Sequence, residues 1–240
     1  MPAPIGLSTA ASGLAAQQAR LDALANDIAN VETAGYRPSS VAFSDLLYQR
    51  EGGVAVGSGV GLADLGRSAT PGSMNESANP LAVAIDGAGF LQVRLADGST
   101  GLTRAGDLQL DAQGNLVTAT GQPLEPRIQV PAGTKPKDVV IAADGTVTAA
   151  GQEVGKIQVV DVSAPSALVA AGGGILKESA ASGAAAPSTS TLRTGMLEAS
   201  GVNIASAMTE LVEAQRAFAL QSRVIKTHDQ LAQIANDIRR

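Results

Sequence analysis

The sequence of 240 residues contains no cysteine and no tryptophan, and only 2% of its residues are aromatic. The absence of cysteine excludes disulfides, thiolate metal sites and a cysteine nucleophile. The scarcity of aromatic side chains leaves few bulky anchors for a ligand pocket or a compact binding hot spot. Cohesion is therefore expected to come from many small contacts spread over extended surfaces.

Basic residues are also in deficit, with 17 Lys and Arg against 22 Asp and Glu and a formal net charge of -5. A nucleic-acid partner would require a basic face, so this balance argues against one. No apolar run approaches the ~20 residues of a membrane span, so membrane insertion is not expected. Residues 1–19 hold no Lys or Arg ahead of an apolar block, which argues against a cleaved secretory signal peptide.

Residues that could carry chemistry are few and scattered. His228 is the only histidine, and its neighbour Asp229 would point in a different direction on a helix. The glycine-rich residues 57–61 lack the Lys-Ser/Thr pair of a phosphate-binding loop. Asp-Gly pairs form hairpin turns more readily than acid–base pairs. The sequence therefore predicts no catalytic residue, no cofactor site and no metal site, and a protein that is not an enzyme.

Large apolar residues recur every seven positions between residues 7 and 31, and some are followed three residues later by another. This pattern is typical of the a/d seam of a helix that packs against other helices. Gly35, with Pro38 shortly after it, predicts the end of the helix. The seam comprises Leu7, Leu14, Leu21, Leu24, Ile28 and Val31.

The last 40 residues show a second helical pattern, with Asn203 as a suitable N-cap. Its apolar residues fall on two neighbouring faces, and such a helix requires more than one partner. We therefore expect both ends of the chain to be assembly elements that become ordered when subunits associate. Pairing of the two ends within one monomer is the alternative. The first face holds Ile204, Met208, Leu211, Phe218 and Ile225, and the second holds Leu220, Val224, Leu231, Ile234 and Ile238.

Between the two helical patterns, apolar residues alternate with polar or small ones, and turn signals separate the runs. The predicted fold is α+β, in which long N- and C-terminal helices pair as a coiled-coil-like core domain with an inserted all-β domain. The predicted boundaries are 1–36 with 200–240 for the helical core, 37–79 for an extended Gly-rich joint, 80–170 for a β-rich outer domain and 171–199 for a small-residue joint.

Three groups of motifs resemble those of the bacterial flagellar rod and hook proteins, and they occur in the same order along nearly the whole chain. The first spans residues 24–37 and includes Asn26, Asn30, Gly35 and Tyr36. The second spans 84–90, 103–106 and 110–117 and includes Asp86, Gly87, Gly89 and Phe90. The third spans 198–203 and 213–218 and includes Asn203, Gln215 and Arg216.

The resemblance implies a structural subunit of the flagellar basal-body rod, which self-assembles helically through its terminal helices into the hollow drive shaft between motor and hook and is required for motility. It implies passage through the flagellar type III export apparatus and a location outside the cytoplasm. The implied partners are further copies of the chain, other rod proteins, the hook protein and the rings or bushing around the rod.

Within this family, residues 43–49 resemble the distal rod type. A short joint after Gln49, and Leu102 where the family usually has an aromatic residue, leave the proximal rod type as an alternative. A glycan- or peptidoglycan-binding module, with the β-domain as its recognition surface, is an alternative from a different class. Phe90 is the only aromatic residue of that domain, which counts against a sugar-binding surface.

Overall fold

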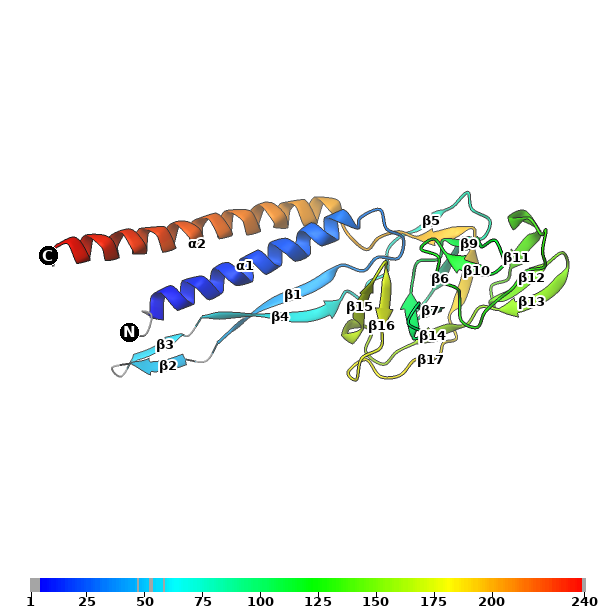
Figure 1. Cartoon of the computed structure of the whole chain (residues 1–240), viewed down its shortest axis with the longest axis horizontal. Helices are drawn as coiled ribbons and strands as arrows, with labels where there is room; N and C mark the ends of the chain where they lie inside the picture. The colour runs from blue at the N-terminus through cyan, green and yellow to red at the C-terminus, as the bar shows by residue number, and fades with distance from the viewer. Residues whose placement is uncertain (1–4, 47, 52–53, 58, 239–240) are drawn as a thin grey trace. The chain divides into compact units, whose positions relative to one another are not determined.

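The computed structural model describes residues 5–46, 48–51, 54–57 and 59–238 (Figure 1). The chain divides into two compact units. The first, here the helical unit, consists of Met1–Ala29, Ser39–Leu65 and Asn203–Arg240. The second, here the β unit, consists of Asn30–Pro38 and Gly66–Val202.

Two long helices, α1 (Ile5–Ala29) and α2 (Ile204–Ile238), lie side by side in the helical unit (Figure 1). Asn203 caps α2, because its Oδ1 accepts the N–H of Ser206 at 3.1 Å. The predicted terminal helices and the predicted cap are therefore confirmed. Val31 lies in the turn that follows α1 rather than within the helix. None of the described helices has the length and apolar character needed to cross a membrane.

Small and polar residues occupy most of the buried positions of the two helices, and Leu24 is the only buried residue among the described members of the predicted leucine seam. Gly13 of α1 lies so close to α2 that an added Cβ would be 3.2 Å from Gln221 Nε2. Ala207 and Ala214 are the buried residues of α2. Helices that meet through alanine and glycine gain close approach but bury little apolar area per residue.

The glycine-rich segment predicted as an extended joint is extended, and its strands are paired. Ser39–Asp45 (β1) pairs with Val60–Arg67 (β4), and Tyr48–Glu51 (β2) pairs with Val54–Gly57 (β3). Side chains of α1 hold this ribbon, since Ser12 Oγ accepts the N–H of Val60 at 3.2 Å. The valines and leucines between the glycines supply the alternation that a strand requires.

The β unit is built from antiparallel strands, and its largest sheet has the order β15-β16-β8-β7-β14-β17. These strands are Val169–Gly172 (β15), Ile175–Lys177 (β16), Thr100–Thr103 (β8), Phe90–Arg94 (β7), Val159–Asp161 (β14) and Ala186–Pro187 (β17). A second sheet contains Val139–Ile141 (β11), Thr146–Ala149 (β12) and Gln152–Lys156 (β13).

Three strand pairs complete the β unit, and two short 3-10 helices connect its strands. The pairs are Leu108–Leu110 (β9) with Leu116–Thr118 (β10), Val83–Asp86 (β6) with Thr191–Thr194 (β18), and Met74–Glu76 (β5) with Met196–Glu198 (β19). The 3-10 helices are Pro136–Asp138 (η1) and Pro165–Ala167 (η2).

Aliphatic side chains from both larger sheets and from two of the strand pairs form the main core of the β unit, and a second, smaller cluster contains Phe90, Leu102, Val160, Val162 and Leu168. The predicted turns lie between these strands, and Gly98, Gly114 and Gly145 have positive φ there. The segment predicted as a small-residue joint instead contains β16, β17, β18 and β19, and residues 173–174 form a turn between β15 and β16. The most buried core residues include Leu81, Val83, Leu91, Val93, Leu108, Leu116, Ile128 and Val147.

Candidate functional site

The residues predicted to pair helices differ widely in burial within a single chain. Leu24 is buried, while Leu14, Leu21, Ile28, Leu211, Phe218 and Ile225 are half-buried, as is Val31 beyond the helix. Ile204 and Met208 are exposed, at 46% and 53% of their surface. The side chain of Leu7 lies outside the described residues.

The half-buried residues of α2 share one face of the helix. Leu211, Phe218 and Ile225 repeat every seven residues, as do the buried Ala207 and Ala214. Seven residues are nearly two helical turns, so these positions align along α2. Met208 falls outside this register, whereas Ile204 continues it one repeat before Leu211 but lies at the start of α2. The predicted stripe is therefore half-buried at Leu211, Phe218 and Ile225 and exposed at Ile204 and Met208.

A broad side of α2 presents large apolar residues that are 45–62% exposed in the described chain. Exposed apolar surface of this extent on a soluble chain marks an interaction surface more often than a free one. We call these residues the exposed α2 face. They are Ile204, Met208, Val212, Leu220, Val224, Leu231 and Ile234.

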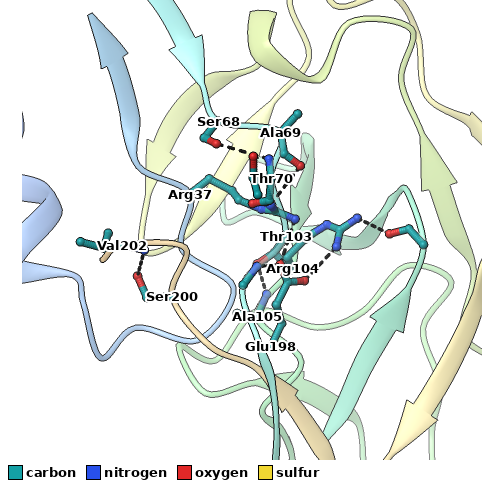
Figure 2. A network of polar contacts seen from close by, with 12 residues as sticks. Arg37, Ser68, Ala69, Thr70, Thr103, Arg104, Ala105, Glu198, Ser200 and Val202 are labelled. Atoms are coloured by element: carbon teal, nitrogen blue, oxygen red, sulfur yellow. Dashed lines mark hydrogen bonds and ion pairs between the residues drawn. The ribbon is translucent and has the colours of Figure 1, made fainter. Parts of the chain in front are cut away.

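A buried ionic junction forms the second candidate site, and it lies wholly in the β unit (Figure 2). Glu198, at the end of β19, is only 2% exposed and contacts two arginines. Its Oε1 lies 2.9 Å from Arg37 Nη2, and its Oε2 lies 2.8 Å from Arg104 Nη1. The backbone N–H of Gly72 also donates to Oε1, at 3.1 Å. One carboxylate therefore joins three segments that are distant in sequence.

Further hydrogen bonds fix both arginines of this Glu198 junction. Arg104 Nη2 donates to the carbonyl oxygen of Gly87 at 2.7 Å, and its guanidinium lies 5.5 Å from the centre of the Phe90 ring. Arg37 Nη1 donates to the carbonyl oxygen of Ala69 at 3.1 Å. Each guanidinium thus has backbone partners in addition to the shared carboxylate.

Burial lowers the pKa of the Arg37 guanidinium, Glu198 raises it, and the cationic Arg104 lowers it again. Two buried cations share one buried anion, so the junction depends on that single carboxylate. Removing one partner of a buried ion pair leaves an uncompensated charge, which usually costs about 3–5 kcal/mol.

Gly35 allows the chain to pass the junction at close range. Its N–H donates to the carbonyl oxygen of Glu198 at 2.8 Å, and its φ is 67°. An added Cβ would lie 2.5 Å from the backbone carbon of Arg104, so a side chain does not fit. The next residue, Tyr36, is buried and its carbonyl oxygen accepts the N–H of Gly201 at 2.9 Å.

Residues 86–90 of the second motif group lie beside the same junction. Asp86 forms an ion pair with Arg193 at 2.7 Å. Gly87 and Gly89 both have positive φ, and Cβ atoms there would collide with Ser190 and with the backbone of Val160. The two glycines therefore let the loop before β7 pack tightly, next to the buried Phe90.

The remaining motif residues lie elsewhere. Asn26 is exposed and Asn30 is half-buried, and Asn30 Oδ1 accepts a hydrogen bond from Thr33 Oγ1 at 3.2 Å. Gln215 and Arg216 are exposed on α2. Among the described residues there is no group of three His, Cys, Asp or Glu side chains that could hold a metal ion.

Sequence reasoning missed the ionic junction, although its three members lie within the quoted motifs. Arg37 ends the first motif, Arg104 lies in the second group and Glu198 begins the third. A single sequence does not show that a charged residue is buried. For Arg104, the available signal was its position between small residues in the motif 103–106.

Three protein families match separate parts of the chain. Residues 7–37 match a family described as flagella basal body rod protein, and residues 193–238 match the C-terminal region of flagellar basal body rod FlgEFG proteins. Residues 84–149 match the D1 domain of the flagellar hook proteins FlgE/F/G.

Whole-length relatives agree with these matches. The flagellar basal-body rod protein FlgG of Agrobacterium fabrum is 35% identical over 96% of this chain and 97% of that protein. FlgG of Caulobacter vibrioides is 36% identical over 97% of this chain and 98% of that protein. The chain belongs to the flagellar basal-body rod protein family.

Rod proteins of this family are structural proteins and not enzymes, in agreement with the prediction from the sequence. The FlgG relatives fit the distal rod type that residues 43–49 indicated. The rod protein FlgF of Escherichia coli is also similar, at 32% identity over 95% of this chain. The family segments at 7–37 and 193–238 contain most of α1 and α2, together with Arg37 and Glu198 of the junction.

Proposed function

We propose that this chain is a subunit of the distal part of the flagellar rod, and that its copies assemble helically through α1 and α2 into the hollow shaft that links motor to hook. The exposed α2 face carries this proposal. It holds seven large apolar side chains that are 45–62% exposed among the described residues, and it lies in a segment that the rod family shares.

The energetic reason for assembly lies in this uncovered surface. Burying a large aliphatic side chain contributes about 1.5–3 kcal/mol, so even partial burial of seven of them would stabilise a contact between subunits strongly. Within each subunit, the seven-residue repeat of Leu211, Phe218 and Ile225 supports coiled-coil-like pairing of α2 with α1. The covered face would then serve the subunit itself and the exposed face its neighbours.

The terminal helices are proposed to become fully stable only in the assembly. Their covered faces contain mainly alanine, glycine and half-buried residues, which offset little of the entropy lost when helices of 25 and 35 residues become ordered. The residues proposed for assembly are Leu7, Leu14, Leu21, Leu24, Ile28, Val31, Ile204, Met208, Leu211, Phe218 and Ile225, together with the rest of the exposed α2 face.

Family membership supports the further partners of this proposal. Subunits would leave the cytoplasm through the flagellar type III export apparatus. In the cell envelope they would contact other rod proteins, the hook protein, and the rings or bushing around the rod.

Substitution of Leu220 tests the exposed α2 face directly. Leu220 is 62% exposed in the single chain, so Leu220→Asp should leave the free protein folded. In a subunit contact, an unpaired carboxylate among apolar groups should cost several kcal/mol per subunit and abolish rod assembly and motility. Leu220→Met keeps the apolar surface and the helix propensity, and it should preserve both. Normal motility with Leu220→Asp would contradict the proposal.

A further inference from the structure

A cavity of about 350 Å³ lies in the β unit and shares Arg37 and Arg104 with the Glu198 junction. Its wall is largely apolar, yet three guanidinium groups line it. Arg67, at the end of β4, is the third and is half-buried. The apolar part of the wall includes Pro71, Met74, Ile85, Phe90 and Leu176.

Arg67 is held firmly on one side only. Its Nη1 donates to Tyr36 Oη at 3.0 Å and to the carbonyl oxygen of Arg37 at 2.9 Å. Its guanidinium also lies 5.4 Å from the centre of the Tyr36 ring. Its Nε and Nη2 have no hydrogen-bond or ion-pair partner among the residues that the structure describes. These contacts fix the orientation of the guanidinium, and its Nε and Nη2 form an edge of two N–H donors that is available to a ligand.

The same chain shows what this edge binds when it is used. Arg94 Nε donates to Glu125 Oε2 at 3.1 Å, and Arg94 Nη2 pairs with Glu125 Oε1. Two parallel N–H donors match the two oxygens of a carboxylate, which makes this the preferred planar partner of such an edge. The free edge of Arg67 thus has the geometry of a carboxylate receptor.

The charges around the cavity favour an anion. Arg37 and Arg104 share the single carboxylate of Glu198, so one positive charge remains there. Asp86 is already paired with Arg193. Asp161 lines the cavity, but no Lys or Arg nitrogen lies within 4 Å of it in the described part of the chain. Arg67 adds a second positive charge, and Asp161 balances one of the two, so one positive charge remains around the cavity.

We propose that this cavity receives the carboxylate of an Asp or Glu side chain from a second copy of the chain, bound by Nε and Nη2 of Arg67. Charge complementarity supports a second copy as the source, because each copy carries 22 acidic against 17 basic residues. The proposal rests on the self-assembly proposed above, since assembly brings the copies together.

Sedimentation of the purified full chain gives the critical concentration for assembly and tests the proposal. Arg67→Gln should raise it roughly five- to ten-fold, the loss expected for one charge-assisted pair. Arg94→Gln removes an exposed arginine of the same type and should change it less than about two-fold. Asp161→Asn removes the competing negative charge and should lower the critical concentration, an effect opposite to that of damaged folding.

Acetate serves as a probe of the site itself, with chloride at equal ionic strength as its control. In the monomer, acetate should shift the Nε resonance of Arg67 saturably, and in the assembly it should raise the critical concentration of the unsubstituted chain but not of Arg67→Gln. Absence of saturable acetate binding would overturn the site. Acetate binding combined with unchanged assembly of all three variants would overturn the second copy as occupant.

Two further outcomes would also decide the proposal. If Arg67→Gln fails to fold, an Asp161→Asn variant that assembles no more readily than the unsubstituted chain overturns the proposal. If the unsubstituted chain binds acetate but does not assemble, the proposed self-assembly through the helices fails, and the second copy fails with it while the carboxylate site stands.

Discussion

The β unit and the helical unit bury different kinds of side chain. In the β unit, residues such as Leu91, Leu108 and Val147 are fully buried in a core that one chain completes. In the helical unit, seven large apolar residues of α2 are exposed, Leu211, Phe218 and Ile225 are half-buried, and alanines take the buried positions of α2. The β unit therefore has the interior of a self-sufficient domain, while the helical unit leaves large apolar side chains exposed, which the proposed assembly would cover.

The largest expected effect concerns the ionic junction of the β unit. Glu198→Ala leaves Arg37 and Arg104 buried without their carboxylate and should lower the free energy of unfolding by about 3–5 kcal/mol. Glu198→Gln retains the volume and an acceptor oxygen and should cost less. Urea unfolding followed by circular dichroism measures both. A loss below about 1 kcal/mol for Glu198→Ala would show that the junction does not stabilise the β unit.

A matched pair of leucines tests the contrast between the units directly. Leu91 is fully buried and Leu220 is 62% exposed. In the free chain, Leu91→Ala should lower stability by about 2–5 kcal/mol, whereas Leu220→Ala should change it by less than about 0.5 kcal/mol. Thermal or urea unfolding of the unassembled protein gives both values. Equal losses at the two positions would remove the distinction between the units.

The cap of α2 should have a moderate effect. Asn203→Ala removes the acceptor for the Ser206 N–H and should cost about 1 kcal/mol of helix stability. Asn203→Asp keeps an acceptor and should be close to neutral. Far-ultraviolet circular dichroism of the free chain would report the loss as lower helicity. Equal helicity in the two variants would argue that Asn203 has no capping role.

Acid should weaken the β unit by a smaller amount. The Asn115 side chain donates to Asp111 and lowers the pKa of that carboxyl. The backbone N–H of Thr146, and then its hydroxyl, donate to Asp144 and lower the pKa of that carboxyl. A lowered folded-state pKa gives stability that is present above the unfolded pKa of about 4 and is lost as pH falls through the folded value. Urea midpoints measured at pH 7 and pH 3 should therefore differ, with the lower midpoint at pH 3.

The helices and turns could be predicted because their signals are local. The seven-residue repeat marked α1, Asn203 marked the start of α2, and the Asp-Gly pairs marked the turns before β8 and β12. Glycine at positive φ and side-chain caps act within a few residues. Such signals can be read from one sequence without knowledge of distant contacts.

The strands in the glycine-rich segments and the ionic junction could not be predicted in this way. β1 and β4 are held partly by hydrogen bonds from α1, such as that of Ser12 with Val60. Glu198 meets Arg37 and Arg104 across 161 and 94 residues of sequence, respectively. From local composition, the glycines predict a flexible segment and the charged residues predict solvent exposure. The tertiary contacts instead pair the glycine-rich strands and bury the charges.

Hydrogen exchange on the dilute chain, with its monomeric state verified by sedimentation, tests the central claim most directly. Amides of β7 and β8 should be strongly protected in the monomer, while those of α1 and α2 should exchange much faster and become protected only after assembly. Helices as well protected as the β unit in a verified monomer would contradict the claim that the helical unit is completed by its neighbours.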